Sequence, residues 1–199
     1  MSNNSLPICT AFSGFRRLAA GPLHQVAIAA KAAIELGTAE SVTIYEDATG
    51  QLVEVDIRGS EAEVIARLSS GLKEPESRGP GRPRLGVVAR EVTLLPRHWE
   101  WLNAQPGGAS VALRKLVEGA RRTHSAADRR REEQGAAYRF IASIAGNLPD
   151  FEEAARALFA DDAARFAEVV AAWPPDLRSH AIRLAFGDTS DTKAPNSLA

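Results

Sequence analysis

The chain has 199 residues, of which 45% are apolar and 25% charged, with one cysteine and a formal net charge of -1. This composition excludes a disordered chain and a disulfide scaffold, because the apolar fraction is ordinary and Cys9 has no second cysteine to pair with. No apolar stretch approaches the roughly 20 residues that cross a bilayer, and the first residues lack the pattern of a signal peptide. We therefore expect a cytoplasmic protein that binds no membrane.

The net charge conceals three blocks of different sign. Residues 1–77 carry 6 basic and 10 acidic side chains, residues 78–131 carry 12 and 4, and residues 132–199 carry 6 and 11. A basic block between acidic flanks is typical of a segment that binds a polyanion, because clustered cations release the counterions of phosphates. All its basic residues except Lys115 are arginines, which suit phosphate oxygens and base edges. The alternative is a solvated, Arg-rich helical face.

Residues 1–70 are predicted to form a small α+β unit. The pattern predicts a strand at residues 8–12 and an Ala-rich helix at residues 22–36 that is stopped by Gly37. A hairpin is predicted at residues 41–57 and a second helix at residues 60–68. Ser60 and Glu63 form a capping-box pattern at the start of the second helix. Cys9 falls on the first strand, where we expect it to be buried and unreactive.

Residues 71–85 are rich in Ser, Gly, Pro and charge, which predicts a linker or arm. The end of this segment, residues 78–84, reads Arg-Gly-Pro-Gly-Arg-Pro-Arg. It resembles the Gly-Arg-Pro core of an AT-hook, an extended arm that lays arginines in the narrow minor groove of A·T-rich DNA. The resemblance implies minor-groove or phosphate contacts for Arg82 and Arg84. The same composition also suits an ordinary soluble linker.

Residues 86–123 combine one strand with two helices. Residues 86–95 are rich in β-branched side chains, Pro96 predicts the first turn of a short helix, and residues 105–108 end it. The second helix carries apolar side chains at helical spacing over residues 110–121. One strand and two short helices cannot bury their apolar side chains alone, so we predict a homodimer formed through residues 87–95 and 110–121. Pairing of the strand with the N-terminal hairpin is the alternative.

This order of strand, helix, Gly turn and helix resembles the ribbon-helix-helix regulators of the Arc, MetJ and CopG kind over about forty residues. In that family two chains pair their strands into a ribbon that enters the major groove, and the second helix clamps a phosphate with its N-terminus. Carried over by position, the resemblance implies that Arg90, Val92 and Leu94 face the groove. It implies a phosphate clamp made by Ser110 and the amides of residues 108–110.

The match to the ribbon-helix-helix pattern is imperfect. Val92 and Leu94 do not suit base edges, the opposite face of the strand would present Glu91, and the first helix is short. Either the Arg-rich arm contacts DNA in place of the ribbon, or the segment has the shape of this family without its activity. Backbone contact is assigned to Arg97, and Arg114 and Lys115 complete the predicted DNA-binding residues.

Residues 124–187 are predicted to form a helical bundle, and residues 188–199 a disordered tail. Asp150, Asp161 and Asp176 are expected to cap the last three helices. Apolar and aromatic side chains recur at helical spacing in each of them, which is typical of core residues and not of a ligand site. The whole chain is thus predicted to be α+β, with the small N-terminal unit, the central strand-helix-helix and this bundle.

The sequence carries no motif for catalysis. The four histidines are His24, His98, His124 and His180, and none has a partner at metal-ligand spacing on the same helix face. We therefore predict no enzyme activity, no metal and no cofactor.

The chain as a whole resembles an uncharacterised family of bacterial, mainly proteobacterial, cytoplasmic proteins of about 200 residues. The residues that carry this resemblance are Gly-Arg-Pro at 81–83, Arg-Glu-Val-Thr-Leu-Leu-Pro-Arg-His-Trp-Glu-Trp-Leu at 90–102, and Gln-Pro-Gly-Gly-Ala-Ser at 105–110. The resemblance covers nearly the whole chain and implies no activity.

Three functions remain open from the sequence. The first is a DNA-binding transcriptional regulator or nucleoid-associated factor that acts through the basic central segment. The second is an antitoxin-like protein-interaction module whose C-terminal helices hold a protein partner. The third is a small-molecule enzyme or binding domain in the N-terminal unit, which would need a pocket of convergent polar groups.

Overall fold

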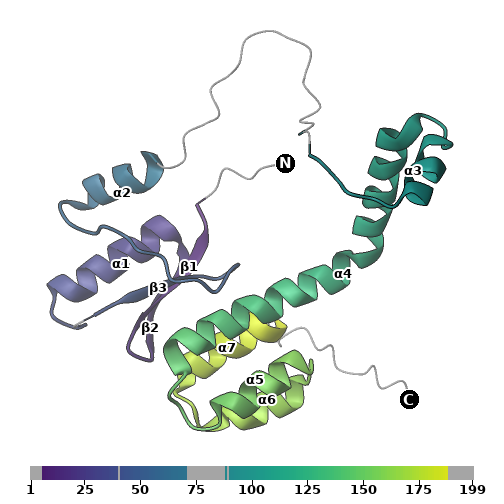
Figure 1. Ribbon diagram of the computed structural model, residues 1–199. Coiled ribbons are helices and arrows are strands. Elements are labelled where there is room, and N and C mark those ends of the chain that lie inside the picture. Colours follow the sequence, from purple (N-terminus) through teal and green to yellow (C-terminus); the bar gives the residue numbers. More distant parts are fainter. Residues whose placement is uncertain (1–5, 40, 71–87, 89, 188–199) are drawn as a thin grey trace, which may run out of the picture. The chain divides into compact units, whose positions relative to one another are not determined.

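The computed structural model describes residues 6–39, 41–70, 88 and 90–187. The chain divides into two compact units (Figure 1). Unit 1 comprises Met1–Lys73 and Arg130–Ala199, and unit 2 comprises Glu74–Arg129. The predicted α+β class is confirmed, since the strands lie in the N-terminal part and helices make up most of the rest. Across the described residues, no helix combines the length and apolar character that a membrane span requires.

Unit 1 contains an antiparallel sheet with the strand order β2-β1-β3. Its strands are β1 Ile8–Ser13, β2 Arg16–Pro22 and β3 Thr43–Glu46. The predicted hairpin of residues 41–57 forms in part. Its first strand is β3, the Glu46 amide donates to the Gln51 carbonyl over 2.9 Å, and the Val53 amide donates to the Ile44 carbonyl over 2.8 Å. Residues 51–57 alternate in exposure as expected of a strand, but they pair with β3 at one bridge, Tyr45 with Leu52. β3 has four residues, so its free edge is too short for a longer ladder.

Alternate side chains of β1 face two different cores, because successive residues of a strand point to opposite sides of the sheet. Cys9 and Ala11 are buried in a small core on the side of α1 Leu23–Glu35. Thr10 is also fully buried, and Phe12 belongs to the larger core formed with the C-terminal helices. The sheet is therefore covered on both faces, and β1 is buried accordingly.

The two N-terminal helices begin as the sequence predicts. α1 follows Pro22, and Gly37, with φ of +65°, comes directly after its C-cap Leu36. α2 Glu61–Ser70 starts with the predicted capping box: the Ser60 amide donates to Glu63 Oε2 over 2.7 Å, and the Glu63 amide donates to Ser60 Oγ over 3.3 Å.

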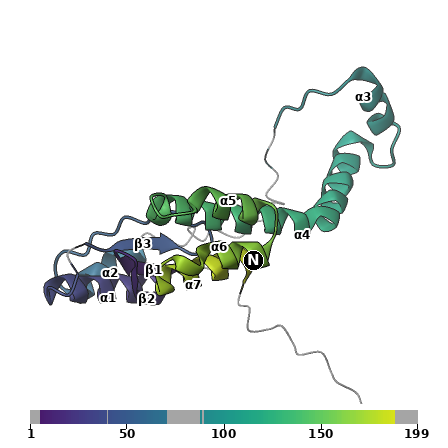
Figure 2. The same cartoon turned by 90° about the horizontal axis from the view of Figure 1, so that it is seen from below.

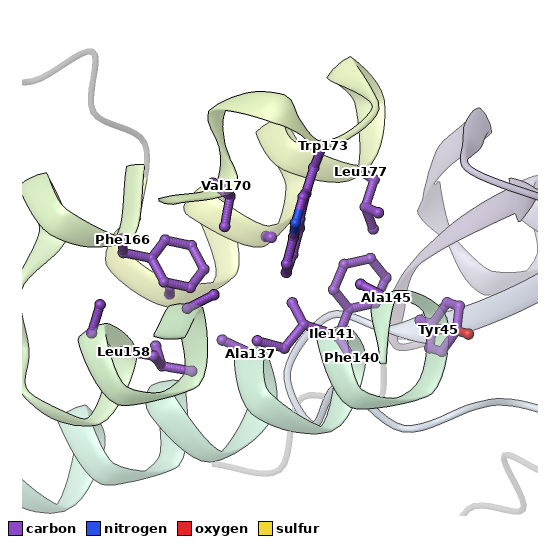
Figure 3. Packing of buried hydrophobic residues seen from close by; sticks show 14 of the residues in the cluster. Tyr45, Ala137, Phe140, Ile141, Ala145, Leu158, Phe166, Val170, Trp173 and Leu177 are labelled. Atoms are coloured by element: carbon purple, nitrogen blue, oxygen red, sulfur yellow. The ribbon is translucent and has the colours of Figure 1, made fainter. Parts of the chain in front are cut away.

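The C-terminal helices build the larger core around the last sixteen residues of α4 (Figures 1 and 2). These elements are α4 Gly108–Ala145, α5 Phe151–Phe159, α6 Ala163–Val169, the 3-10 helix η1 Val170–Ala172 and α7 Pro175–Phe186. Figure 3 shows Phe140, Ile141, Phe166, Trp173 and Leu177 converging on one another. All five are buried, as predicted for side chains at helical spacing.

The caps of these helices differ from the prediction. Asp162 caps α6 by accepting from the Arg165 amide over 2.9 Å, so the prediction of Asp161 is wrong by one residue. Asp150 occupies the N-cap position of α5 without a side-chain cap bond. Asp176 lies inside the first turn of α7, where its carboxylate accepts from the Arg17 amide of β2 over 2.9 Å.

Unit 2 consists of α3 Pro96–Asn103 and the N-terminal part of α4. Pro96 occupies the first turn of α3, as predicted. The predicted strand is not formed within the described part of the segment, because residues 90–95 carry no regular secondary structure and no strand of the sheet pairs with them. The alternative prediction, in which the strand pairs with the N-terminal hairpin, is likewise not seen for residues 90–95.

α4 is one helix of 38 residues, where the sequence predicts separate helices on either side of residue 123. Residues 120–131 contain no Gly or Pro, and Ala and Arg favour helix. The polar stretch that we interpreted as a boundary therefore continues the helix, since the loss of apolar periodicity does not by itself end one.

Candidate nucleic-acid interface

α3 and α4 of unit 2 form a helical hairpin (Figure 1). Leu102 of α3 and Ala112 of α4 are its buried apolar side chains, exposed by 3% and 7%. Gly107 and Gly108 both have positive φ, of +87° and +74°, which lets the chain turn sharply between the helices. The Gly107 Cα also lies close to Val111, since a Cβ built there would be 3.1 Å from that side chain.

Most other apolar side chains of unit 2 are exposed. These side chains are between 36% and 57% accessible: Val92, Leu95, Trp99, Trp101, Leu116 and Val117. So much exposed apolar area around one short hairpin is unusual for a monomeric domain. It is typical of a surface that another chain covers. Leu116 and Val117 belong to the apolar positions that the sequence assigns to a dimer.

The predicted DNA-binding residues lie at different places in the chain. Arg82 and Arg84 are outside the described residues. Arg90 precedes α3 and is exposed, and Arg97 is exposed in the first turn of α3. The rest of α3, residues 98–103, separates Arg97 from the turn that leads to Ser110 and is about 9 Å long.

The residues of the predicted phosphate clamp lie at the start of α4. Ser110 is exposed in the first turn of α4, where the first amides of a helix have no acceptor four residues earlier. The Gly108 amide, however, donates to the Gln105 carbonyl over 2.9 Å, so it is not available to a phosphate. The prediction that all three amides of residues 108–110 bind the ligand is wrong on this point.

Four of the predicted DNA-contacting cations lie in the described residues and contact no carboxylate. Arg114 Nε donates to the Ser110 carbonyl over 3.1 Å and is otherwise exposed. In the part of the chain that the structure describes, neither Arg90, Arg97, Arg114 nor Lys115 forms an ion pair. Unpaired arginines keep their full charge for an anionic partner.

Sequence reasoning missed a polar junction in the larger core of unit 1. Asp47 accepts from Thr10 Oγ1 over 2.9 Å and from Arg183 Nη2 over 2.8 Å, and the same Nη2 lies 2.8 Å from His180 Nδ1. The His180 ring has no exposed surface and packs edge-on against Phe12 and Phe140. The pKa of His180 is lowered to about 4. Burial is the main cause, Asp47 opposes it, and Arg183 and Arg17 contribute to the lowering.

This junction joins α7 to the sheet but opens onto no described cavity. The shallow cavity of about 250 Å³ in unit 1 lies elsewhere, between α1, β3 and residues 52–57. Its lining is almost entirely aliphatic, with Glu54 as its titratable side chain. Cys9 is buried as predicted, and burial raises the pKa of its thiol to about 11, which disfavours the thiolate form. These features give the enzyme hypothesis no convergent polar groups.

Comparison with known proteins identifies a family without assigning an activity. The family model described as "Uncharacterized protein conserved in bacteria (DUF2239)" matches residues 8–185, which include all of unit 2 and most of unit 1. No curated protein and no solved structure matches the chain significantly. The resemblance to an uncharacterised bacterial family of about this length is confirmed, and the chain belongs to the bacterial family DUF2239.

Proposed function

We propose that the chain is a DNA-binding protein, a transcriptional regulator or nucleoid-associated factor, that contacts DNA as a homodimer through unit 2. One observation carries this proposal. Among the described residues, the segment 90–95 that leads into α3 has no ladder partner. This segment exposes Val92 and Leu95, and the hairpin next to it exposes four further large apolar side chains beside arginines that form no ion pair. A second copy would pair the segment and cover the apolar side chains, and the arginines would remain for the phosphates and base edges.

The nucleic-acid part of the proposal is tested by binding of the full chain to a labelled random duplex. Affinity is expected to fall by orders of magnitude between ~50 and ~200 mM salt, because several phosphate contacts release counterions. The variant Arg82→Ala/Arg84→Ala/Arg90→Ala is expected to bind at least tenfold more weakly. Equal binding by this variant and the wild type, or no binding by either, would contradict the proposal.

A matched control removes the same charge from unit 1. Arg58, Arg156 and Arg165 are exposed there and lie in surface ion pairs. The variant Arg58→Ala/Arg156→Ala/Arg165→Ala is expected to keep wild-type affinity within about twofold, because surface pairs contribute little to stability and these side chains lie outside the proposed interface. A loss equal to that of the first variant would show a net-charge effect without a site.

The dimer is tested by Leu116→Glu. Leu116 is 50% exposed in the single chain, so the substitution leaves the fold of the monomer intact. Burying a glutamate in a dimer core is costly, so light scattering is expected to show a shift from dimer to monomer, with DNA affinity at least tenfold weaker. A Leu116→Glu chain that keeps the wild-type mass would place the dimer contact elsewhere.

The protein-interaction alternative is supported by a second exposed apolar cluster, on unit 1. Tyr138 of α4 and Phe159 of α5 are 38% and 56% exposed, and their ring centroids lie 5.4 Å apart. Aromatic side chains of this kind are enriched in protein interfaces. Mainly apolar binding of a protein there would respond weakly to salt, which separates it from DNA binding.

A further inference from the structure

α4 carries five basic side chains on one face, and this arrangement exists because the helix is continuous. Lys115, Arg122 and Arg129 are seven residues apart, which brings them to nearly the same side of a helix with 3.6 residues per turn. Arg114 and Arg121 are one position earlier and border the same face. All five side chains are exposed.

The apolar positions of α4 lie on the opposite face. Leu113, Leu116 and Ala120 are rotated by about half a turn from the basic face. A chain that covers the apolar face, as the proposed dimer does, therefore leaves the basic face in solvent. The two surfaces can act at the same time.

The basic face keeps most of its charge. Glu118 lies on it and pairs with Arg121 over 3.4 Å, while Arg122 Nε lies 3.4 Å from the Glu118 carbonyl. The Arg121 and Glu118 side chains are 75% and 56% exposed, so solvent screens this pair strongly. Asp128 is a second carboxylate at the border of this face, and it is not without a partner. The balance is clearly positive over the length of the face.

We infer that this basic face, between Arg114 and Arg129, is a second phosphate-binding surface, which contacts the backbone of duplex DNA without reading its sequence. The inference rests on the proposed function and extends it beyond the ribbon and the start of α4. The face is about 22 Å long, comparable to six or seven base-pair steps at 3.4 Å each. Arginine is the residue that best matches phosphate oxygens, and four of the five cations are arginines.

The test is the salt dependence of DNA binding. The full chain and the variant Arg121→Gln/Arg122→Gln/Arg129→Gln are titrated with a labelled random duplex at several salt concentrations between ~50 and ~200 mM. Gln preserves helix propensity, and circular dichroism checks the helix content. Each lost phosphate contact lowers the slope of log K against log salt by about 0.9, so the expected decrease is about 2.7 per chain. The loss is expected to be equal on A·T-rich and G·C-rich duplexes, because phosphates carry no sequence information.

The outcomes separate the inference from the proposed function. An unchanged slope in the α4 variant, while Arg82→Ala/Arg84→Ala/Arg90→Ala binds weakly, overturns the inference and leaves the proposed function. Absence of DNA binding by the wild type overturns both the inference and the proposed function. Binding of the wild type to anionic lipid vesicles, without binding to DNA, also overturns both. A slope decrease of the same size in Arg58→Gln/Arg156→Gln/Arg165→Gln overturns the inference, because it would show an effect of net charge alone.

Discussion

Unit 1 and unit 2 differ in how far a single chain completes them. In unit 1 both faces of the sheet are covered, large aromatic side chains such as Phe12 and Phe140 are fully buried, and Arg183 contacts both Asp47 and the buried His180. In unit 2 the hairpin buries Leu102 and Ala112 but exposes both of its tryptophans. Buried apolar area is the main source of stability, so we expect unit 1 to be the more stable unit and unit 2 to gain most from a partner.

The largest expected difference between the units comes from deleting an aromatic ring. Phe140→Ala empties a fully buried site between Phe12, Tyr45 and His180, so unit 1 is expected to lose about 3–5 kcal/mol. Trp101→Ala is expected to change the stability of unit 1 by less than about 0.5 kcal/mol. Urea unfolding followed by Trp173 fluorescence reports unit 1 specifically when Phe140→Ala is measured in a Trp99→Phe/Trp101→Phe background and Trp101→Ala in a Trp99→Phe background. Equal losses of stability in the two variants would contradict the conclusion that unit 1 has a complete core and unit 2 does not.

The turn after β3 tests whether the backbone of unit 1 is also tightly packed. Gly50 has φ of +66°, and a Cβ built there would lie 1.9 Å from the Ala136 carbonyl oxygen of α4. Gly50→Ala is therefore expected to destabilise unit 1 by roughly 3–4 kcal/mol, from strain and overpacking together.

Gly37→Ala is the matched control for this prediction. Gly37 has φ of +65°, but a Cβ there meets no atom within 4 Å, so about 1 kcal/mol is expected. Thermal melting of the two variants measures the difference. Similar melting temperatures would show that the turn does not pack against α4.

A smaller effect is expected from the buried ion pair. Arg183→Gln removes the 2.8 Å partner of Asp47, a carboxylate that is 11% exposed, and is expected to cost about 2 kcal/mol. Arg156→Gln breaks a surface pair with Glu153 and is expected to cost less than about 0.5 kcal/mol. Chemical denaturation of both variants checks this, and an equal cost would mean that the junction contributes no more than a surface pair.

The pH dependence of unit 1 should report His180. Because burial lowers its pKa from 6.5 to about 4, the unfolded chain binds a proton in this range more readily than the folded chain does. Stability is then highest above pH 6.5 and falls by roughly 1–2 kcal/mol between pH 6.5 and 5. His180→Gln is expected to flatten that part of the profile. An unchanged slope in the variant would assign the dependence to other groups.

Local signals in the sequence predicted most elements of unit 1. The capping box of Ser60 and Glu63, the Gly37 stop and the apolar spacing of the last helices all formed as expected. β2 was missed because its Ala, Gly and Arg residues lack β-branched side chains, and it is held by pairing with β1. The Asp47–Arg183 contact joins residues 136 positions apart, and no local pattern predicts such a pair.

For unit 2 the sequence predicted the helices and the exposed cations but not the length of α4. The ribbon-helix-helix resemblance suggested a short second helix, whereas the polar residues after Ala120 continue it for more than six turns. The basic face could be found only once that continuity was known. It remains a prediction that residues 86–95 form a strand by pairing with the same segment of a second chain.

The most direct measurement is sedimentation of the full chain with a short labelled duplex at ~50 mM salt. Two chains of 21.3 kDa per duplex are expected, with the complex dissociating by ~200 mM salt. A monomer that leaves the duplex free at low salt would contradict the proposal that unit 2 is completed by a second copy and then binds DNA.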